Sequence, residues 1–141
     1  MTILPLRGSM PFMKATIFTD GGARGNPGPA GIGVVITGTH PKNIAEYIGE
    51  ATNNVAEYKA LIRGLLEAIK LGYREADVFA DSELMVKQIK GEYRVKQPHL
   101  IPLVQECRDL ISVFQRFTIS HVRREQNKEA DKLVNQAIDN R

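Results

Sequence analysis

The spacing of the apolar residues changes once along this chain, near residue 53, and that change limits the folds available to it. Before this point, three segments alternate apolar and polar side chains or are rich in β-forming residues. Short turn-like stretches separate these segments, which lie at 14–20, 30–38 and 43–51. Three consecutive strands with short connections predict an antiparallel meander.

A helix is predicted over 53–71, where apolar residues recur at helical spacing. Thr52 or Asn53 supplies its N-cap, and Gly72 supplies its C-cap. The later segments favour a strand at 76–81, helices at 82–90 and 98–115, a strand at 116–122 and a helix at 127–140.

This order of elements predicts an α/β fold with a mixed five-stranded sheet of strand order 3-2-1-4-5, in which strand 2 is antiparallel and helices flank the sheet. Each strand after the meander is reached through a helix, so it should run parallel to strand 1 by a right-handed crossover. In such a sheet a crevice lies at the carboxyl ends of strands 1 and 4. Both strands end in an aspartate, Asp20 and Asp81.

The composition fits one ordinary domain and leaves the partner open. A chain of 141 residues, 43% of them hydrophobic, is long enough to bury a core of its own. Its net charge of +3 permits a polyanionic partner without identifying one. Cys107 is the only cysteine, which excludes a disulfide framework and a thiolate metal cluster. No apolar run approaches the ~18 residues of a membrane span, and no signal-peptide pattern is present, so we expect a cytoplasmic protein.

The first residues differ in character from the rest. They include the stretch "RGSM", at 7–10, which resembles a leader added for expression. We expect 1–12 to be such a leader or disordered, and 13–141 to form a single domain.

A glycine-rich stretch, "TDGGARGNPG" at 19–28, raises the question of a phosphate-binding loop. Such a loop binds its anion at the start of a helix, whereas this stretch leads into a strand. Its glycine spacing matches neither common phosphate-loop pattern. We therefore expect a hairpin connection in which glycines supply positive φ and Asn26-Pro27-Gly28 forms the turn.

Four acidic residues are expected to meet at one edge of the sheet. Asp20 and Asp81 end neighbouring strands, and two like charges side by side are unfavourable unless a cation lies between them. Glu57 lies early in the helix over 53–71 and Asp131 early in the last helix, each followed at helical spacing by apolar residues. An acid near a helix start also favours the helix dipole, which explains either one alone but not the convergence of four.

Carboxylates without a sulfur ligand or a convincing histidine favour a hard, oxygen-loving cation. The prediction is Mg²⁺, with Mn²⁺ able to substitute. Two such ions ~3.5–4 Å apart activate a water and stabilise the leaving oxygen in phosphodiester cleavage.

Four motifs, "FTDGGARGNPGPAGIG", "TNNVAEYKAL", "ADSELMV" and "NKEADKLVNQA", resemble in order and spacing the acidic motifs of type 1 ribonuclease H. The resemblance covers about 14–140 and implies the ribonuclease H-like fold. It implies endonucleolytic hydrolysis of the RNA strand of an RNA/DNA hybrid, leaving 5′-phosphate and 3′-hydroxyl ends, with two ions when substrate is bound. The positions that match the family's metal-binding catalytic acids are Asp20, Glu57, Asp81 and Asp131.

Further positions match family residues that contact the substrate: Gly21, Asn26, Thr52, Asn53 and Asn54. Short amides and hydroxyls on tight turns can reach a minor groove and bond to 2′-hydroxyls. Helix capping by Thr52 or Asn53, and a turn role for Asn26, are the competing interpretations.

The chain also departs from the family pattern. The family's loop histidine, associated with product release, is missing from 123–127, and the candidates to replace it are His121, Arg124 and Glu125. The family's basic protrusion is missing too, because "KGEYRVKQPHL" is too short for it. Within this stretch Lys90, Tyr93, Arg94 and Lys96 either contact a phosphate backbone or form a solvated loop.

These departures resemble the short-loop branch of archaea and some bacteria, in which some members also cleave double-stranded RNA. A monomer without a membrane partner is expected. The alternatives are a non-catalytic module of the same fold that binds hybrids or duplex RNA, and a strand-transfer enzyme or junction resolvase. The four acids oppose the first alternative, while the chain length and the acid pattern oppose the second.

Overall fold

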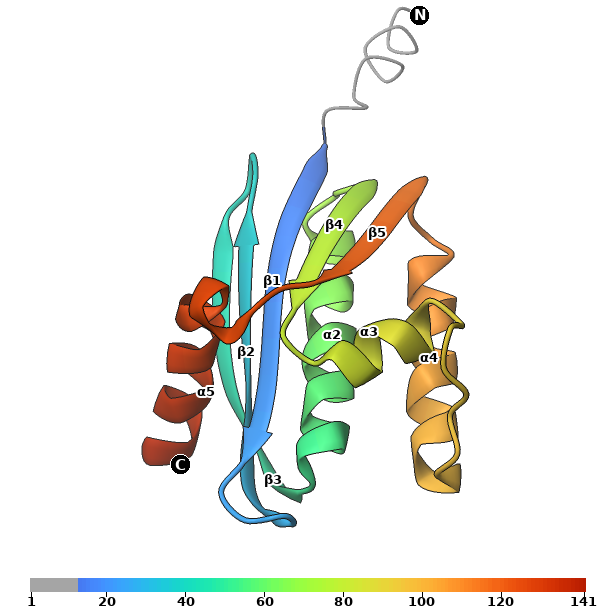
Figure 1. The fold of residues 1–141 in the computed structure, drawn as a ribbon. Helices are drawn as coiled ribbons and strands as arrows, with labels where there is room; N and C mark the ends of the chain where they lie inside the picture. Colours follow the sequence, from blue (N-terminus) through green and yellow to red (C-terminus); the bar gives the residue numbers. More distant parts are fainter. Residues whose placement is uncertain (1–12) are drawn as a thin grey trace, which may run out of the picture.

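The computed structural model describes residues 13–141. Residues 1–12, and with them the expected leader, lie outside this part. Figure 1 shows the elements in chain order. They are β1 (Lys14–Ala23), β2 (Gly28–Thr37), β3 (Lys42–Ala51), α2 (Asn53–Lys70), β4 (Glu75–Ala80), α3 (Glu83–Ile89), the 3₁₀ turn η2 (Pro98–Leu100), α4 (Ile101–Ile111), β5 (Arg116–His121), the 3₁₀ turn η3 (Arg124–Gln126) and α5 (Lys128–Asp139).

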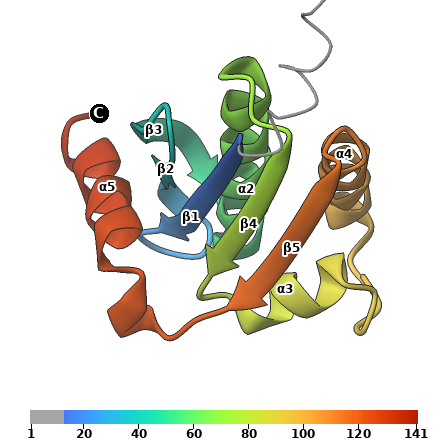
Figure 2. The same cartoon turned by 90° about the horizontal axis from the view of Figure 1, so that it is seen from above.

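The predicted sheet is confirmed. Its strand order is β3-β2-β1-β4-β5, with β2 antiparallel to β1 and β3, and with β4 parallel to β1 and β5. Seen from above, α5 covers one face of this sheet while α2 and α4 cover the other (Figure 2). The arrangement is therefore the mixed, helix-flanked α/β fold expected from the order of elements.

The main core lies between the sheet and α2. Alternate residues of β1 and β4, such as Ile17 and Val78, face Leu61 and Leu65 of α2, and all four side chains are fully buried. Cys107 of α4 is buried beside this core, as a helical, apolar surrounding predicts. No helix within 13–141 is long and apolar enough to cross a membrane.

The predicted hairpin connection between β1 and β2 is confirmed, but it is shorter than expected. β1 continues three residues beyond the predicted end, because Gly21, Gly22 and Ala23 still pair with β2. Only Gly25 in this stretch has a positive φ, of 103°, and the Asn26–Pro27 peptide is cis. The glycine at position 21 serves another purpose: a Cβ there would lie 2.2 Å from the Ala56 carbonyl oxygen. Gly21 thus allows the backbone of α2 to approach β1 closely at Ala56.

The helix predicted over 98–115 is shorter in the structure. The 3₁₀ turn η2 precedes α4, which ends at Ile111 with Ser112 as its C-cap. The four residues that follow turn back so that Phe114 enters the core and Gln115 donates to the Arg74 carbonyl. Helical spacing alone does not reveal where this helix ends, because Phe114 is buried in a core to which several other elements contribute.

Candidate active site

The sheet opens at the carboxyl ends of β1 and β4. Their pairing stops at Thr19 and Ala80, and the next residue of each strand is an aspartate, Asp20 or Asp81. After Asp81 the chain turns away, because Ser82 caps the start of α3 by accepting a hydrogen bond from the Met85 amide at 3.2 Å. The two carboxylates are thereby left side by side at the open edge.

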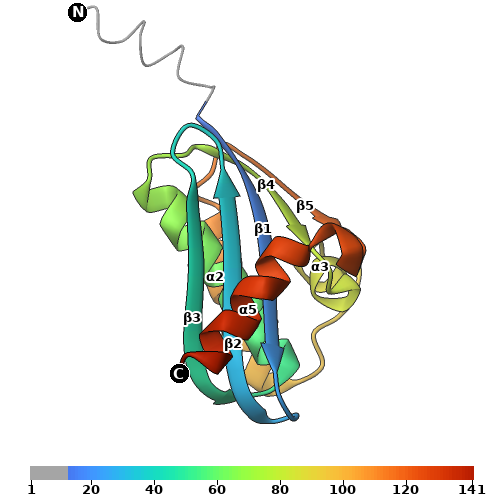
Figure 3. The same ribbon diagram turned by 90° about the vertical axis from the view of Figure 1, so that its left-hand side faces the viewer.

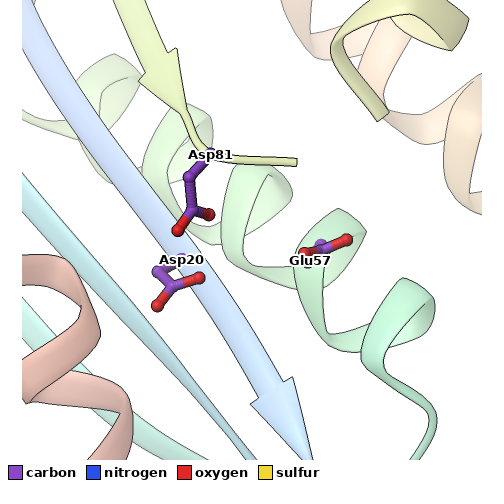
Figure 4. A group of neighbouring side chains, drawn as sticks. All are labelled: Asp20, Glu57 and Asp81. Atoms are coloured by element: carbon purple, nitrogen blue, oxygen red, sulfur yellow. The ribbon is translucent and has the colours of Figure 1, made fainter. Parts of the chain in front are cut away.

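Glu57 reaches the same edge from α2. One carboxylate oxygen each from Asp20, Glu57 and Asp81 lies within 4.8 Å of the others. Figure 4 shows Asp81 directed toward Asp20, with Glu57 on the neighbouring helix. The close approach of α2 at Gly21 brings Glu57 to this position, because residue 57 directly follows the Ala56 carbonyl that Gly21 accommodates.

Asp131 lies in the first turn of α5, outside this compact group of three but in the same cavity. It approaches from the opposite face of the sheet, where α5 crosses β2 and β1 (Figure 3). The four acids that the sequence singled out therefore line one cavity, three of them in close contact and the fourth near Asp20.

The surroundings disfavour four charged carboxylates without a counterion. Burial is the main cause that raises the pKa of Asp20 to about 8, and the nearby charges of Asp81, Asp131 and Glu57 add to it. Burial also raises the pKa of Glu57 to about 7, against a lowering hydrogen bond from Ser82. Partly buried, mutually repelling oxygen donors suit a hard divalent cation, which would neutralise them. The residues present thus fit the metal that the sequence implied.

Three of the five expected substrate contacts line the cavity: Gly21, Asn53 and Asn54. Asn53 is held on both sides, since its Oδ1 accepts from the Ala23 amide at 2.8 Å and its own amide donates to Asn26 Oδ1 at 3.0 Å. Asn26 therefore supports Asn53, and Thr52 caps α2 by accepting from the Val55 amide at 3.3 Å. The glycine turn and the start of α2 form one connected unit.

The three residues that could replace the family's loop histidine differ in their position relative to the cavity. Arg124, in η3, lines the cavity, whereas His121 and Glu125 are not among its lining residues. His121 is the last residue of β5, opposite Ala80.

A second groove adjoins the first and shares Asn54 and Leu84 with it. Tyr93, Arg94 and Lys96 line this groove, while Lys90 lies in a different groove against α4 and β5. Two cationic side chains, Arg94 and Lys96, thus line a groove next to the acidic cavity, together with the acidic Glu92.

Sequence reasoning missed Arg24, Asn127 and Asn135. Arg24 and Asn135 line the cavity, and the Asn127 side chain is 1% exposed. An asparagine before a helix is a common N-cap signal, which was available for Asn127. The signal predicts a helix start, though, and not the contact of its side chain with a distant strand.

Comparisons with known proteins agree with this geometry. A family model described as "Reverse transcriptase-like" matches residues 18–137. The chain is 50% identical over 131 residues to a bifunctional protein of Mycobacterium tuberculosis, covering 90% of this chain and 36% of that protein. It is 33% identical to the ribonuclease H of Chromohalobacter salexigens, covering 99% of this chain and 92% of that protein.

The first curated relatives are longer proteins, of which this chain spans about a third. Among solved structures, LC11-RNase H1 in complex with an RNA/DNA hybrid is 46% identical. It superimposes with a TM-score of 0.84 over 89% of this chain and 97% of that one.

Proposed function

The chain belongs to the ribonuclease H family, and from this premise we propose that it is a metal-dependent endoribonuclease that hydrolyses the RNA strand of RNA/DNA hybrids. The products are a 5′-phosphate and a 3′-hydroxyl. Residues 13–141 act in this proposal as one ribonuclease H domain, working as a monomer.

One observation carries the proposal: carboxylate oxygens of Asp20, Glu57 and Asp81 lie within 4.8 Å of one another at the open edge of the sheet. These three acids and Asp131 would hold Mg²⁺, or Mn²⁺ in its place, as two ions when substrate is bound. Bound divalent cations supply an activated water and stabilise the oxygen that leaves phosphorus.

The protein's own contribution is to fix and shape this edge. The turn that ends β4 and the contact of Gly21 with α2 hold three carboxylates against their mutual repulsion. Asp20 and Glu57 are partly buried, which reduces their contact with bulk water. The site is thus arranged before any ligand binds, which reduces the reorganisation needed for the reaction.

Substrate binding is assigned to the wall formed by Gly21, Asn53 and Asn54, with Arg24 and Arg124 as the cations at the rim. Short amides at a helix start suit the shallow minor groove of an A-like duplex, where 2′-hydroxyls are exposed. The solved relative bound to an RNA/DNA hybrid supports this class of substrate. Contacts to the 2′-hydroxyls of the cleaved strand do not require the opposite strand to be DNA. Double-stranded RNA is therefore a second substrate to test.

The test is cleavage of end-labelled RNA presented as RNA/DNA hybrid, as duplex RNA and as single strand, in Mg²⁺ or Mn²⁺. Asp81→Asn serves as the matched control, because it keeps the side-chain shape and removes one charge. Internal cuts in the hybrid that disappear with EDTA and in the variant are expected. Tight duplex binding without cleavage in either metal would instead identify a non-catalytic binding module, and equal cutting of duplex RNA would extend the substrate class.

A further inference from the structure

Asn127 links the start of α5 to the strand that carries Asp20. Its side chain is 1% exposed, and its Nδ2 donates to the Thr19 carbonyl oxygen at 2.9 Å, across 108 residues of sequence. Thr19 directly precedes Asp20, at the last pair between β1 and β4. The backbone carbonyl of Asn127 in turn accepts from the Asp131 amide at 3.0 Å. One residue therefore contacts the chain next to both acids.

A second contact joins β1 to the same helix further along. Arg24, directly after β1, donates to Asn135 Oδ1 at 3.2 Å and to Asp139 Oδ1 at 2.6 Å. Asn135 then donates to the Asp131 carbonyl oxygen at 3.2 Å. The helix is thus attached to β1 at two places, one on each side of Asp20.

The apolar contacts of α5 bring the helix close to the sheet but do not fix its position along the strands. The helix lies on glycines of β2: a Cβ at Gly33 would be 2.1 Å from the Ala130 carbonyl, and one at Gly31 would be 3.0 Å from the Val134 carbonyl. A surface without side chains lets the helix approach but offers few features that fix its position along the strands. Hydrogen bonds are directional, so the contacts of Asn127 and Arg24 can fix it.

The energetics of Asn127 also indicate a role beyond stability. Its Oδ1 is buried and has no hydrogen-bond partner among residues 13–141. Such an atom is unfavourable, and an apolar residue of similar size would avoid the penalty. The Arg24 pair with Asp139 is largely exposed on both sides, and exposed ion pairs contribute little to stability.

We propose that Asn127 and Arg24 are positioning residues, which hold α5 so that Asp131 stays beside Asp20, and that cation binding at the carboxylates depends on both contacts. This inference rests on the proposed function only in assuming that the site takes a divalent cation.

The test is a double-mutant cycle on Mn²⁺ binding, measured by calorimetry without nucleic acid. Asn127→Leu and Arg24→Gln are each made in the wild-type chain and in an Asp131→Asn background, where the other three carboxylates still bind the ion. Arg24→Lys separates the forked contact from mere charge. Ile119→Val, in the β5 core, controls for a general loss of stability.

We expect Asn127→Leu and Arg24→Gln to weaken Mn²⁺ binding by about tenfold in the wild-type chain, as supporting residues of metal sites do. In the Asp131→Asn background the same changes should have an effect below about twofold, because they act through Asp131. Arg24→Lys should not restore binding, and Ile119→Val should leave it unchanged. Arg24 is a surface residue, so Mn²⁺ binding by its variants tests the inference even if Asn127→Leu does not fold.

Equal weakening in both backgrounds, or no weakening in the wild-type chain, would overturn the inference. Rescue by Arg24→Lys would overturn it for Arg24. Failure of the proposed function has a different signature, namely a wild-type chain that binds Mn²⁺ but leaves the hybrid uncut.

Discussion

Asp20 and Asp81 each directly follow the last residue paired between the parallel strands β1 and β4, and carboxylate oxygens of the two lie within 4.8 Å of one another although β2, β3 and α2 separate them in the chain. This proximity follows from the parallel register, in which Thr19 pairs with Ala80. The proximity has two opposite effects. The two carboxylates repel each other in the metal-free site, and together they attract a divalent cation.

Asp81→Asn should abolish activity and stabilise the metal-free protein. Loss of one metal-ligand charge should reduce hybrid cleavage at least ~100-fold, the upper end of the effect for residues that merely support a metal site. In EDTA the melting temperature should rise, because one repulsive charge is gone. Cleavage assays and thermal unfolding with and without Mg²⁺ measure both effects. A lower melting temperature in EDTA would contradict the idea that repulsion destabilises the empty site.

The stability of the metal-free protein should fall as the pH rises from about 4 to about 8. The pKa of Asp20 is raised from 3.8 to about 8, so between these values the folded state holds a proton that the unfolded state has lost. Stability from this group is complete below pH 4 and is lost as the pH passes through about 8. Urea unfolding in EDTA at several pH values measures the trend. The difference between wild type and Asp20→Asn isolates the contribution of this group, and a difference independent of pH would refute it.

Cation binding should strengthen over the same range. At pH 6 Asp20 and Glu57, with pKa values of about 8 and about 7, hold protons that a divalent ion must displace. Raising the pH to 9 removes these protons beforehand, so the apparent affinity for Mg²⁺ should increase and proton release should decline. Calorimetry in two buffers of different ionisation enthalpy counts the released protons. Affinity that stays constant from pH 6 to 9 would be incompatible with the raised pKa values.

Gly21→Ala should impair both folding and cation binding, whereas Gly22→Ala should be nearly neutral. A Cβ at position 21 would lie 2.2 Å from the Ala56 carbonyl oxygen and push α2, with Glu57, away from the strand. At position 22 the nearest atom would be the Val134 side chain at 3.6 Å, an ordinary contact. Overpacking of this kind costs about 1–3 kcal/mol, which denaturant unfolding resolves. Similar losses in both variants would contradict the steric role assigned to Gly21.

Asn53→Ala and Asn54→Ala should separate support from substrate contact. Asn53 accepts from the Ala23 amide, so its loss should reduce the free energy of unfolding by about 1 kcal/mol as well as raise KM for the hybrid. Asn54 lines both grooves, and its side chain makes no hydrogen bond within 13–141, so its loss should raise KM severalfold at unchanged stability. Steady-state kinetics beside thermal unfolding distinguish the two. An Asn54 variant with unchanged KM would remove this residue from the substrate wall.

The sequence by itself determined the sheet and the place where chemistry gathers. The change of period near residue 53 sets which segments are strands and which are helices, and the rule of right-handed crossovers then orders the strands. The position of Asp20 and Asp81 where the pairing of strands 1 and 4 stops follows from this order, and the inward direction of Glu57 follows from the apolar spacing of its helix. These results are local or topological, so spacing along the chain is sufficient to obtain them.

Only the tertiary structure decided how α5 meets β1. Spacing shows which residues share a face of a helix, but it does not show which carbonyl of a distant strand that face will meet. The contacts of Asn127 with Thr19 and of Arg24 with Asn135 are of this kind. The same limit applies to Gly21, because nothing in its sequence neighbourhood indicates that the Ala56 carbonyl lies against it. Side chains that are fixed by an approaching element depend on packing in three dimensions, and the order of residues alone does not contain that information.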